Sequence, residues 1–204
     1  MPKITAVLAT LGLLLASLML APPAGSASSP WRASITFDKN PKSPSNSRLI
    51  WRLSQRQSDG KWKVVQTRSW RSGSGMLGKT GRNSCVKNKG WLPNGSYAVR
   101  QHNNYNGNLI KGRAFRIDNK RCPNGTSRVD LFIHTEQGAR NRQCANRRGD
   151  QVCRWEYPRY NDYKSHGCIK LAPSHLAQLV RLYQAHFSAG VRYPTGRVVL
   201  RVVS

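Results

Sequence analysis

Acidic residues are scarce in this chain of 204 residues. Eight Asp and Glu stand against 34 Lys and Arg, so the formal charge is +26 at pH 7, and no acidic residue follows Asp162. A chain with this charge could be a disordered basic tail, but disorder also requires low hydrophobicity. Here 38% of the residues are hydrophobic, with six Trp and seven Tyr. No repeat of fixed period is present either. The composition therefore predicts one folded domain.

Long apolar runs are also lacking, apart from one at the N-terminus. Residues 4–20 are apolar, Lys3 precedes them, and Ala24-Gly25-Ser26-Ala27 follows after two prolines. This pattern is typical of a secretory signal peptide, and we expect residues 1–27 to be cleaved. The alternative is an uncleaved anchor, but the run falls short of the ~20 residues of a spanning helix. Residues 28–204 keep a charge of +25, so we expect a secreted basic protein without stable membrane insertion.

The cysteines are odd in number. In an oxidising compartment, five cysteines leave one as a free thiol or an intermolecular bridge. Cys144 and Cys153 bracket a polar segment, and Cys85 and Cys122 lie in turn-rich connections. Pairing Cys85–Cys122 with Cys144–Cys153 is one of three ways to join these four cysteines, and the other two stay open. Cys168 is then the free thiol.

The chain is dominated by residues that alternate with a period of two. At residues 28–47 we expect an N-terminal strand, at 31–37, followed by a Pro/Ser-rich loop. We expect residues 48–204 to form a single domain. Short strands are expected between Gly and Asn turns at 49–53, 62–67, 97–102, 109–117, 128–135 and 197–203. Such spacing indicates a mainly β fold, an antiparallel β-sandwich or barrel.

One segment departs from this alternation. Pro173 can start a helix, and Gly190 can end it. Between them, apolar residues recur at spacings of three and four, at Leu176, Leu179, Val180, Tyr183 and Phe187. The pattern predicts one amphipathic helix at 173–189, packed on the sheet.

The free cysteine lies in Ser165-His166-Gly167-Cys168-Ile169-Lys170-Leu171. A cysteine is nucleophilic as the thiolate, and a nearby imidazole, a cation such as Lys170 or the start of a helix lowers its pKa. Gly167 allows a tight turn that aims backbone amides at a carbonyl, as an oxyanion hole requires. From the chemistry alone, an inert buried thiol and an intermolecular disulfide remain alternatives.

Residues 165–171 resemble the signature of the L,D-transpeptidase catalytic domain, the YkuD-like family. That signature has Ser or Thr, His, Gly and Cys, followed by an apolar residue and then Asn or Arg. The family also has an upstream histidine at the end of a strand, which Phe132-Ile133-His134-Thr135 matches, and Pro93-Asn94-Gly95-Ser96-Tyr97 is similar to its turn before a strand. The resemblance spans about residues 90–204, and it implies a fold of the L,D-transpeptidase catalytic type.

The resemblance also implies an activity. Family members cross-link peptidoglycan by attacking a stem peptide at its third residue, releasing D-Ala and passing the acyl group to an amine of a second stem. It implies Cys168 as nucleophile and His134 as base, and a thioacyl-enzyme splits the amide exchange into two easier steps. It assigns supporting and oxyanion roles to Thr135, Ser165, His166 and Gly167. We therefore expect peptidoglycan stem peptides and anionic wall polymers as partners, at the cell wall, for a monomer that needs no metal and no organic cofactor.

Two features depart from the family pattern. Residues 135–164 separate His134 from Ser165 by about twice the usual length, which predicts an insertion that a Cys144–Cys153 disulfide would close. His102 is the other upstream candidate for the base. Lys170 stands where Asn or Arg is usual, and as a substrate-binding residue it keeps the charge but loses the bidentate guanidinium fork.

Other functions compete with this interpretation. A zinc site from His134, His166 and Cys168 would suit a metallopeptidase, but no carboxylate partner or His-x-x-x-His helix accompanies these residues. A non-catalytic cationic protein could bind anionic wall polymers through its charge alone. An L,D-carboxypeptidase would use water in place of the amine acceptor. Nucleic-acid binding has no recognition motif here and does not fit export.

Overall fold

The structure, a computed structural model, describes residues 29–204 of the chain. The predicted signal peptide at 1–27 lies outside these residues. The described part is mainly β, as predicted, with two larger sheets, one small hairpin and two α-helices. The prediction of purely antiparallel sheets is wrong, because each of the larger sheets contains one parallel pair of strands.

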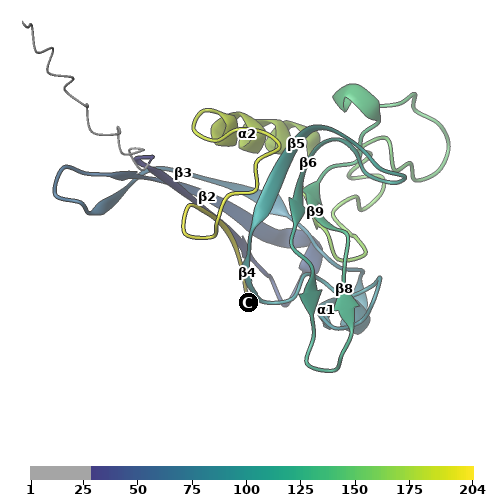
Figure 1. Cartoon of the computed structure of the whole chain (residues 1–204). Helices are drawn as coiled ribbons and strands as arrows, with labels where there is room; N and C mark the ends of the chain where they lie inside the picture. Colours follow the sequence, from purple (N-terminus) through teal and green to yellow (C-terminus); the bar gives the residue numbers. More distant parts are fainter. Residues whose placement is uncertain (1–28) are drawn as a thin grey trace, which may run out of the picture.

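The first sheet contains the N-terminal strand near its centre. Its five strands run in the order β3-β2-β1-β11-β4. β1 pairs in parallel with β11 and antiparallel with β2, so the first strand of the chain is tied to the last. The β2–β3 hairpin extends from the body of the protein (Figure 1). The bounds are β1 Trp31–Asp38, β2 Ser47–Arg56, β3 Trp62–Ser72, β4 Gly95–Tyr97 and β11 Val198–Val203.

The second sheet carries the predicted catalytic residues. The strand expected at 97–102 is interrupted at Ala98, where the chain leaves the first sheet and enters the second. The predicted strand at 128–135 is likewise split into a short β8 and β9. The order is β10-β9-β6-β5, with β5 Val99–Asn106, β6 Lys111–Ile117, β9 Leu131–His134 and β10 Ile169–Lys170. The small hairpin joins β7 Lys120–Arg121 to β8 Ser127–Arg128 around the expected turn at Asn124-Gly125.

The predicted helix is present as α2, Pro173–Gln184, five residues shorter than expected. The chain continues into a further turn, in which the N–H of Phe187 donates to Tyr183 O, so Phe187 stays buried. α2 contributes its apolar face to one core that is shared with both larger sheets. A second helix, α1 Gly78–Arg82, was not predicted, and two 3₁₀ turns occur at Pro44–Asn46 and Ala139–Asn141.

Two disulfides cross-link the protein. Cys85 pairs with Cys122 and Cys144 with Cys153, while Cys168 is a free thiol. This confirms one of the three possible pairings. Structural disulfides form in oxidising compartments, which fits an extracellular environment. Among residues 29–204, no helix is both long and apolar enough to cross a bilayer.

Candidate functional site

Two neighbouring parallel strands bring together the residues that the sequence singled out. β9 ends at His134, and β10 begins directly after Cys168. Their register pairs Ile169 with Ile133 and Lys170 with His134. Because side chains alternate along a strand, His134 and Lys170 lie on one face of the sheet, and Cys168, two residues before Lys170, lies toward the same side. The local fold therefore gathers the predicted nucleophile and base at one edge of the second sheet.

The long connection between these strands has a topological cause. Parallel neighbours cannot be joined by a tight turn and need a crossover of a dozen or more residues. Residues 135–168 form this crossover, and within it only the 3₁₀ turn Ala139–Asn141 is regular. The Cys144–Cys153 disulfide closes part of it, so the chain leaves β9 and returns beside it without displacing His134.

Hydrogen bonds from serine side chains fix the turn that carries the thiol. Ser165 Oγ accepts from the N–H groups of Gly75 at 3.2 Å and Gly167 at 3.1 Å, and it donates to Cys168 O at 2.6 Å. Ser74 Oγ donates to Gly167 O at 3.2 Å. The sequence predicted the supporting position of Ser165 but not that of Ser74. Since the N–H of Gly167 is bound to Ser165, it is not free to stabilise an oxyanion.

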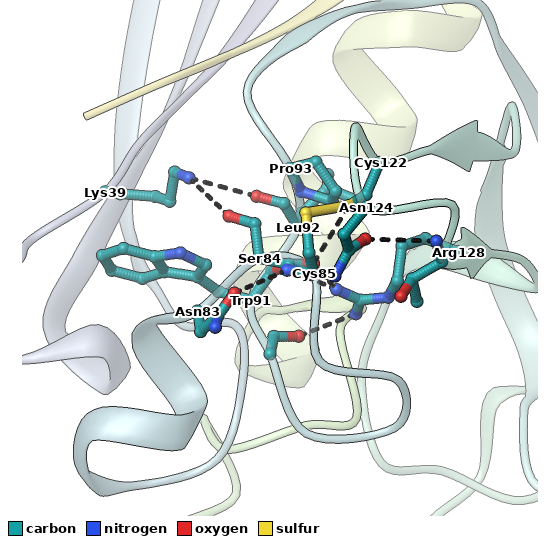
Figure 2. Close-up of a disulfide and its surroundings, with 12 residues drawn as sticks. Lys39, Asn83, Ser84, Cys85, Trp91, Leu92, Pro93, Cys122, Asn124 and Arg128 are labelled. Atoms are coloured by element: carbon teal, nitrogen blue, oxygen red, sulfur yellow. Dashed lines mark hydrogen bonds between the residues drawn. A yellow bond between two sulfur atoms is a disulfide. The ribbon is translucent and has the colours of Figure 1, made fainter.

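A buried arginine lies beneath this turn. Arg128 is 2% exposed, and its guanidinium donates to the carbonyl oxygens of Gly90 at 2.7 Å, Trp91 at 3.2 Å and His166 at 3.3 Å. It also donates to Ser84 O, beside the Cys85–Cys122 disulfide (Figure 2). The guanidinium therefore ties the turn of the thiol to the disulfide-linked loop. The sequence shows Arg128 only as one of many basic residues, without a motif that would have revealed it.

Gly167 is required by the same contact. Its φ of +126° lies in a region that L side chains rarely adopt, and a Cβ there would collide with Arg128 Nη2. The backbone thus passes directly over the guanidinium. This close approach explains in physical terms why glycine precedes the cysteine.

His134 is held as a neutral imidazole. Its Nδ1 lies 3.0 Å from Thr135 O, and since a carbonyl only accepts, Nδ1 carries the proton and Nε2 is left as the base. Burial, with a smaller contribution from the positive charge of Lys170, lowers the pKa of His134 to about 3, against the opposing effect of the Thr135 hydrogen bond. Thr135 supports the histidine through its carbonyl rather than through its hydroxyl, which is buried without a hydrogen-bond partner.

Cys168 rests as a neutral thiol. Its Sγ lies 3.6 Å from Asp130 O, to which it donates, and Asp130 adopts a positive φ of 53° next to the site. Burial raises the pKa of Cys168 to about 11, against the opposing effects of a Phe132 backbone hydrogen bond and of the Lys170 and Arg128 charges. The expectation that nearby cations would produce a low pKa is wrong, because the cost of desolvation is larger.

Lys170 pairs with a carboxylate of the protein itself. Its Nζ forms a buried ion pair with Glu136, and both side chains are almost inaccessible to solvent. Burial raises the pKa of Glu136 to about 7, although the charge of Lys170 opposes the shift. Anchoring a substrate at Lys170 would require this pair to open. The lysine instead places a positive charge next to His134 on the neighbouring strand and against Glu136 of the crossover.

Scarce carboxylates gather in the crossover. Ligand atoms of Glu136, Asp150 and Asp162 lie within 4.8 Å of one another, the one group of three or more potential metal ligands among residues 29–204. Lys170 and Lys164 already pair with two of its members. The group would suit a hard cation such as Ca²⁺ or Mg²⁺, which prefers oxygen ligands.

The remaining histidines do not complete an alternative site. His102 lies on β5, at the opposite edge of the sheet from β10, so sheet order separates it from Cys168. His166 has an exposed side chain and contributes its carbonyl to the Arg128 contact. His134, His166 and Cys168 do not form a group of clustered ligand atoms in the described part of the chain, so the alternative of a zinc site gains no support.

Comparison with known proteins adds no family to this geometry. No family model and no curated protein matches the chain. The resemblance to L,D-transpeptidases therefore depends on the sequence motifs, chiefly residues 165–171 and 132–135.

Proposed function

We propose that the protein is an exported cysteine acyltransferase of the L,D-transpeptidase type, acting on peptidoglycan stem peptides with Cys168 as nucleophile and His134 as base. The observation that carries the proposal is the β9–β10 register, which pairs His134 with Lys170, two residues after Cys168. The Thr135 carbonyl supports it further, since it holds the imidazole with Nε2 unprotonated.

The resting protonation states define the first step of the proposed mechanism. A thiol with a pKa of about 11 does not transfer its proton in advance to an imidazole with a pKa of about 3. The S–H proton passes to His134 Nε2 as the C–S bond forms at the substrate carbonyl. The C–N bond to D-Ala then breaks, and the proton moves from Nε2 to the leaving amine.

The oxyanion needs backbone donors that the turn has not already used. Because Gly167 N–H is bound to Ser165 Oγ, the N–H of Cys168 is the donor next to the nucleophile. Arg128, with its guanidinium under the His166 carbonyl, adds a fixed positive charge behind the turn. An amine of a second stem resolves the thioester in a transpeptidase, and water does so in a carboxypeptidase.

Release of D-Ala from isolated peptidoglycan tests this function. Wild type should release D-Ala, and the variants Cys168→Ala and His134→Gln should not. Lys63→Gln, which alters an exposed basic residue on β3 away from the turn, should retain the release and serves as the control. Equal release by wild type and Cys168→Ala would refute Cys168 as the nucleophile.

One observation favours a second candidate, a non-catalytic cationic wall protein. The resting thiol is protonated and donates to Asp130 O, which is also how an inert cysteine would sit. This candidate predicts that wild type binds isolated wall without releasing D-Ala, and that Cys168→Ala binds equally well. Release of D-Ala that depends on Cys168 would dismiss it.

A further inference from the structure

A pocket of about 770 Å³ lies beside the Cys85–Cys122 disulfide, and none of its lining residues belongs to the turn at 165–168. Four parts of the chain that are distant in sequence line it: Lys39 directly after β1, residues between 82 and 94 at α1 and its following loop, residues 120–123 at β7, and Ser204. Figure 2 shows Lys39, Trp91 and the disulfide converging from these segments. None of these residues has a role in the proposed acyl transfer.

The lining of this pocket is basic. Lys39, Arg82, Lys120 and Arg121 line it, and no Asp or Glu does so. None of these four cations takes part in the ion pairs found among residues 29–204. Unpaired cationic side chains are common in a chain of this charge, and on an open surface they normally extend away from one another into solvent. Here four cationic side chains line the same pocket.

Lys39 is unusual because it is a buried cation without a counter-ion. It is 5% exposed, and its Nζ donates to Leu92 O at 3.2 Å and to Ser84 Oγ at 3.5 Å (Figure 2). The ammonium also lies 4.5 Å from the centre of a Trp91 ring. Two of its three N–H groups thus have neutral acceptors, and the third has no hydrogen-bond acceptor among residues 29–204. Burial lowers the pKa of Lys39 to about 8.

Such a charge is costly to keep in the folded protein. A buried ammonium is disfavoured unless it is paired, and the cation–π contact with Trp91 offsets the cost only in part. A bound anion would supply the missing partner. An anionic ligand would explain a lysine at this position together with the surrounding cations.

The walls of the pocket are rigid before any ligand binds. The Cys85–Cys122 disulfide fastens the loop after α1 to β7, so the segments that carry Arg82 and Lys120 cannot drift apart. On the inner side, Arg128 holds the carbonyl oxygens of Ser84 and Trp91. A backbone that is already held in place does not need to be ordered on binding, which favours affinity.

We propose that this pocket binds the phosphate group of a phosphate ester. Several cations around one hollow suit a phosphate, which accepts hydrogen bonds at several oxygens and for which lysine is a common point-charge ligand. Trp91, Pro93 and Pro123 supply an apolar wall for the organic part of the ester. The source is either a small phosphate monoester or the phosphodiester of an anionic polymer. The proposal does not depend on the acyl-transfer activity.

Binding is measured on the disulfide-intact protein at 0.15 M salt by calorimetric titration with glycerol 3-phosphate and with a glycerol phosphodiester oligomer. Lys39→Met and Lys120→Gln should each weaken binding about tenfold or more, whereas Lys63→Met, which removes an exposed charge on β3, should leave it within about twofold. Lys39→Met replaces an unpaired buried charge with an apolar chain of similar length, so it should fold. If Lys39→Met does not fold, the weakening of binding by Lys120→Gln tests the proposal instead.

The outcome separates the two sources and can refute the proposal. Binding of the monoester alone identifies a small ester, and tighter binding of the oligomer identifies a polymer. In either case, saturation should raise the pKa of Lys39, followed by NMR at its ε-carbon, but not that of Lys63. Absence of saturable binding, or equal weakening by the pocket variants and by Lys63→Met, would show non-specific attraction to a basic surface and overturn the proposal.

Discussion

At the scale of single residues, burial governs the chemistry of the site more than neighbouring charge does. The sequence places a lysine, a histidine and a helix start near Cys168, and each of them lowers the pKa of a thiol. In the folded protein, desolvation outweighs them and raises the pKa to about 11. The same effect keeps His134 uncharged. The thiol therefore becomes reactive only as its proton is removed during attack.

The pH dependence of alkylation tests this protonation state. The rate at which iodoacetamide modifies Cys168 should rise about tenfold per pH unit from pH 7 toward pH 11, because only the thiolate reacts and its fraction grows tenfold per unit below the pKa. The two disulfides leave Cys168 as the one free thiol of the chain. Mass spectrometry measures the rate. A plateau below pH 9 would show a stabilised thiolate and contradict the burial argument.

At the scale of elements, the turn at 165–168 depends on a close backbone approach. Gly167→Ala should cost about 1–3 kcal/mol for the strained backbone and more for the collision with Arg128. Gly149→Ala is a matched control, because Gly149 also has a positive φ, of +97°, but open space around it. Urea unfolding should show the larger loss for Gly167→Ala. Equal losses would mean that the Arg128 contact does not constrain the turn.

Local patterns predicted most of the elements but not how they pair. Alternation and Asn-Gly turns located the hairpins, and the three-and-four spacing located α2. The parallel pairs β1–β11 and β9–β10 could not be predicted, since they join segments far apart in the chain and leave no local signal. The break at Ala98 was missed for the same reason. The sequence of an apolar strand does not show which of the two sheets the strand joins.

Some residues of the candidate site could likewise be predicted from local sequence, and others could not. Cys168, His134 and Ser165 stand in recognisable motifs and lie together as those motifs imply. Arg128 and Glu136 were missed because their importance comes from burial against backbone carbonyls or a lysine 34 residues away. Burial of a charged residue is a property of tertiary packing, which one sequence does not reveal.

At the scale of the whole molecule, the charge of +26 acts mainly through long-range attraction. Few acids are present to neutralise it, and four of the eight lie in the crossover at Glu136, Asp150, Glu156 and Asp162. The rest of the protein therefore presents an excess of cations. Such a field concentrates a protein near an anionic polymer and is screened by salt.

Salt dependence tests the role of this charge. Wild type and Cys168→Ala should bind isolated cell wall equally at low ionic strength, since the thiol contributes nothing to attraction at a distance. Both should be released as NaCl rises toward 1 M, where the screening length falls to about 3 Å. Co-sedimentation measures the bound fraction. Binding that persists in 1 M NaCl would contradict electrostatic retention.

The central claim is that Cys168 is a nucleophile of the L,D-transpeptidase type. Intact mass after exposure to a carbapenem tests it most directly, because this β-lactam class acylates such thiols. We expect one covalent adduct on the disulfide-intact protein, none on Cys168→Ala, and a much slower reaction for His134→Gln. The absence of any adduct on the wild-type protein, or an adduct that persists in Cys168→Ala, would contradict the claim.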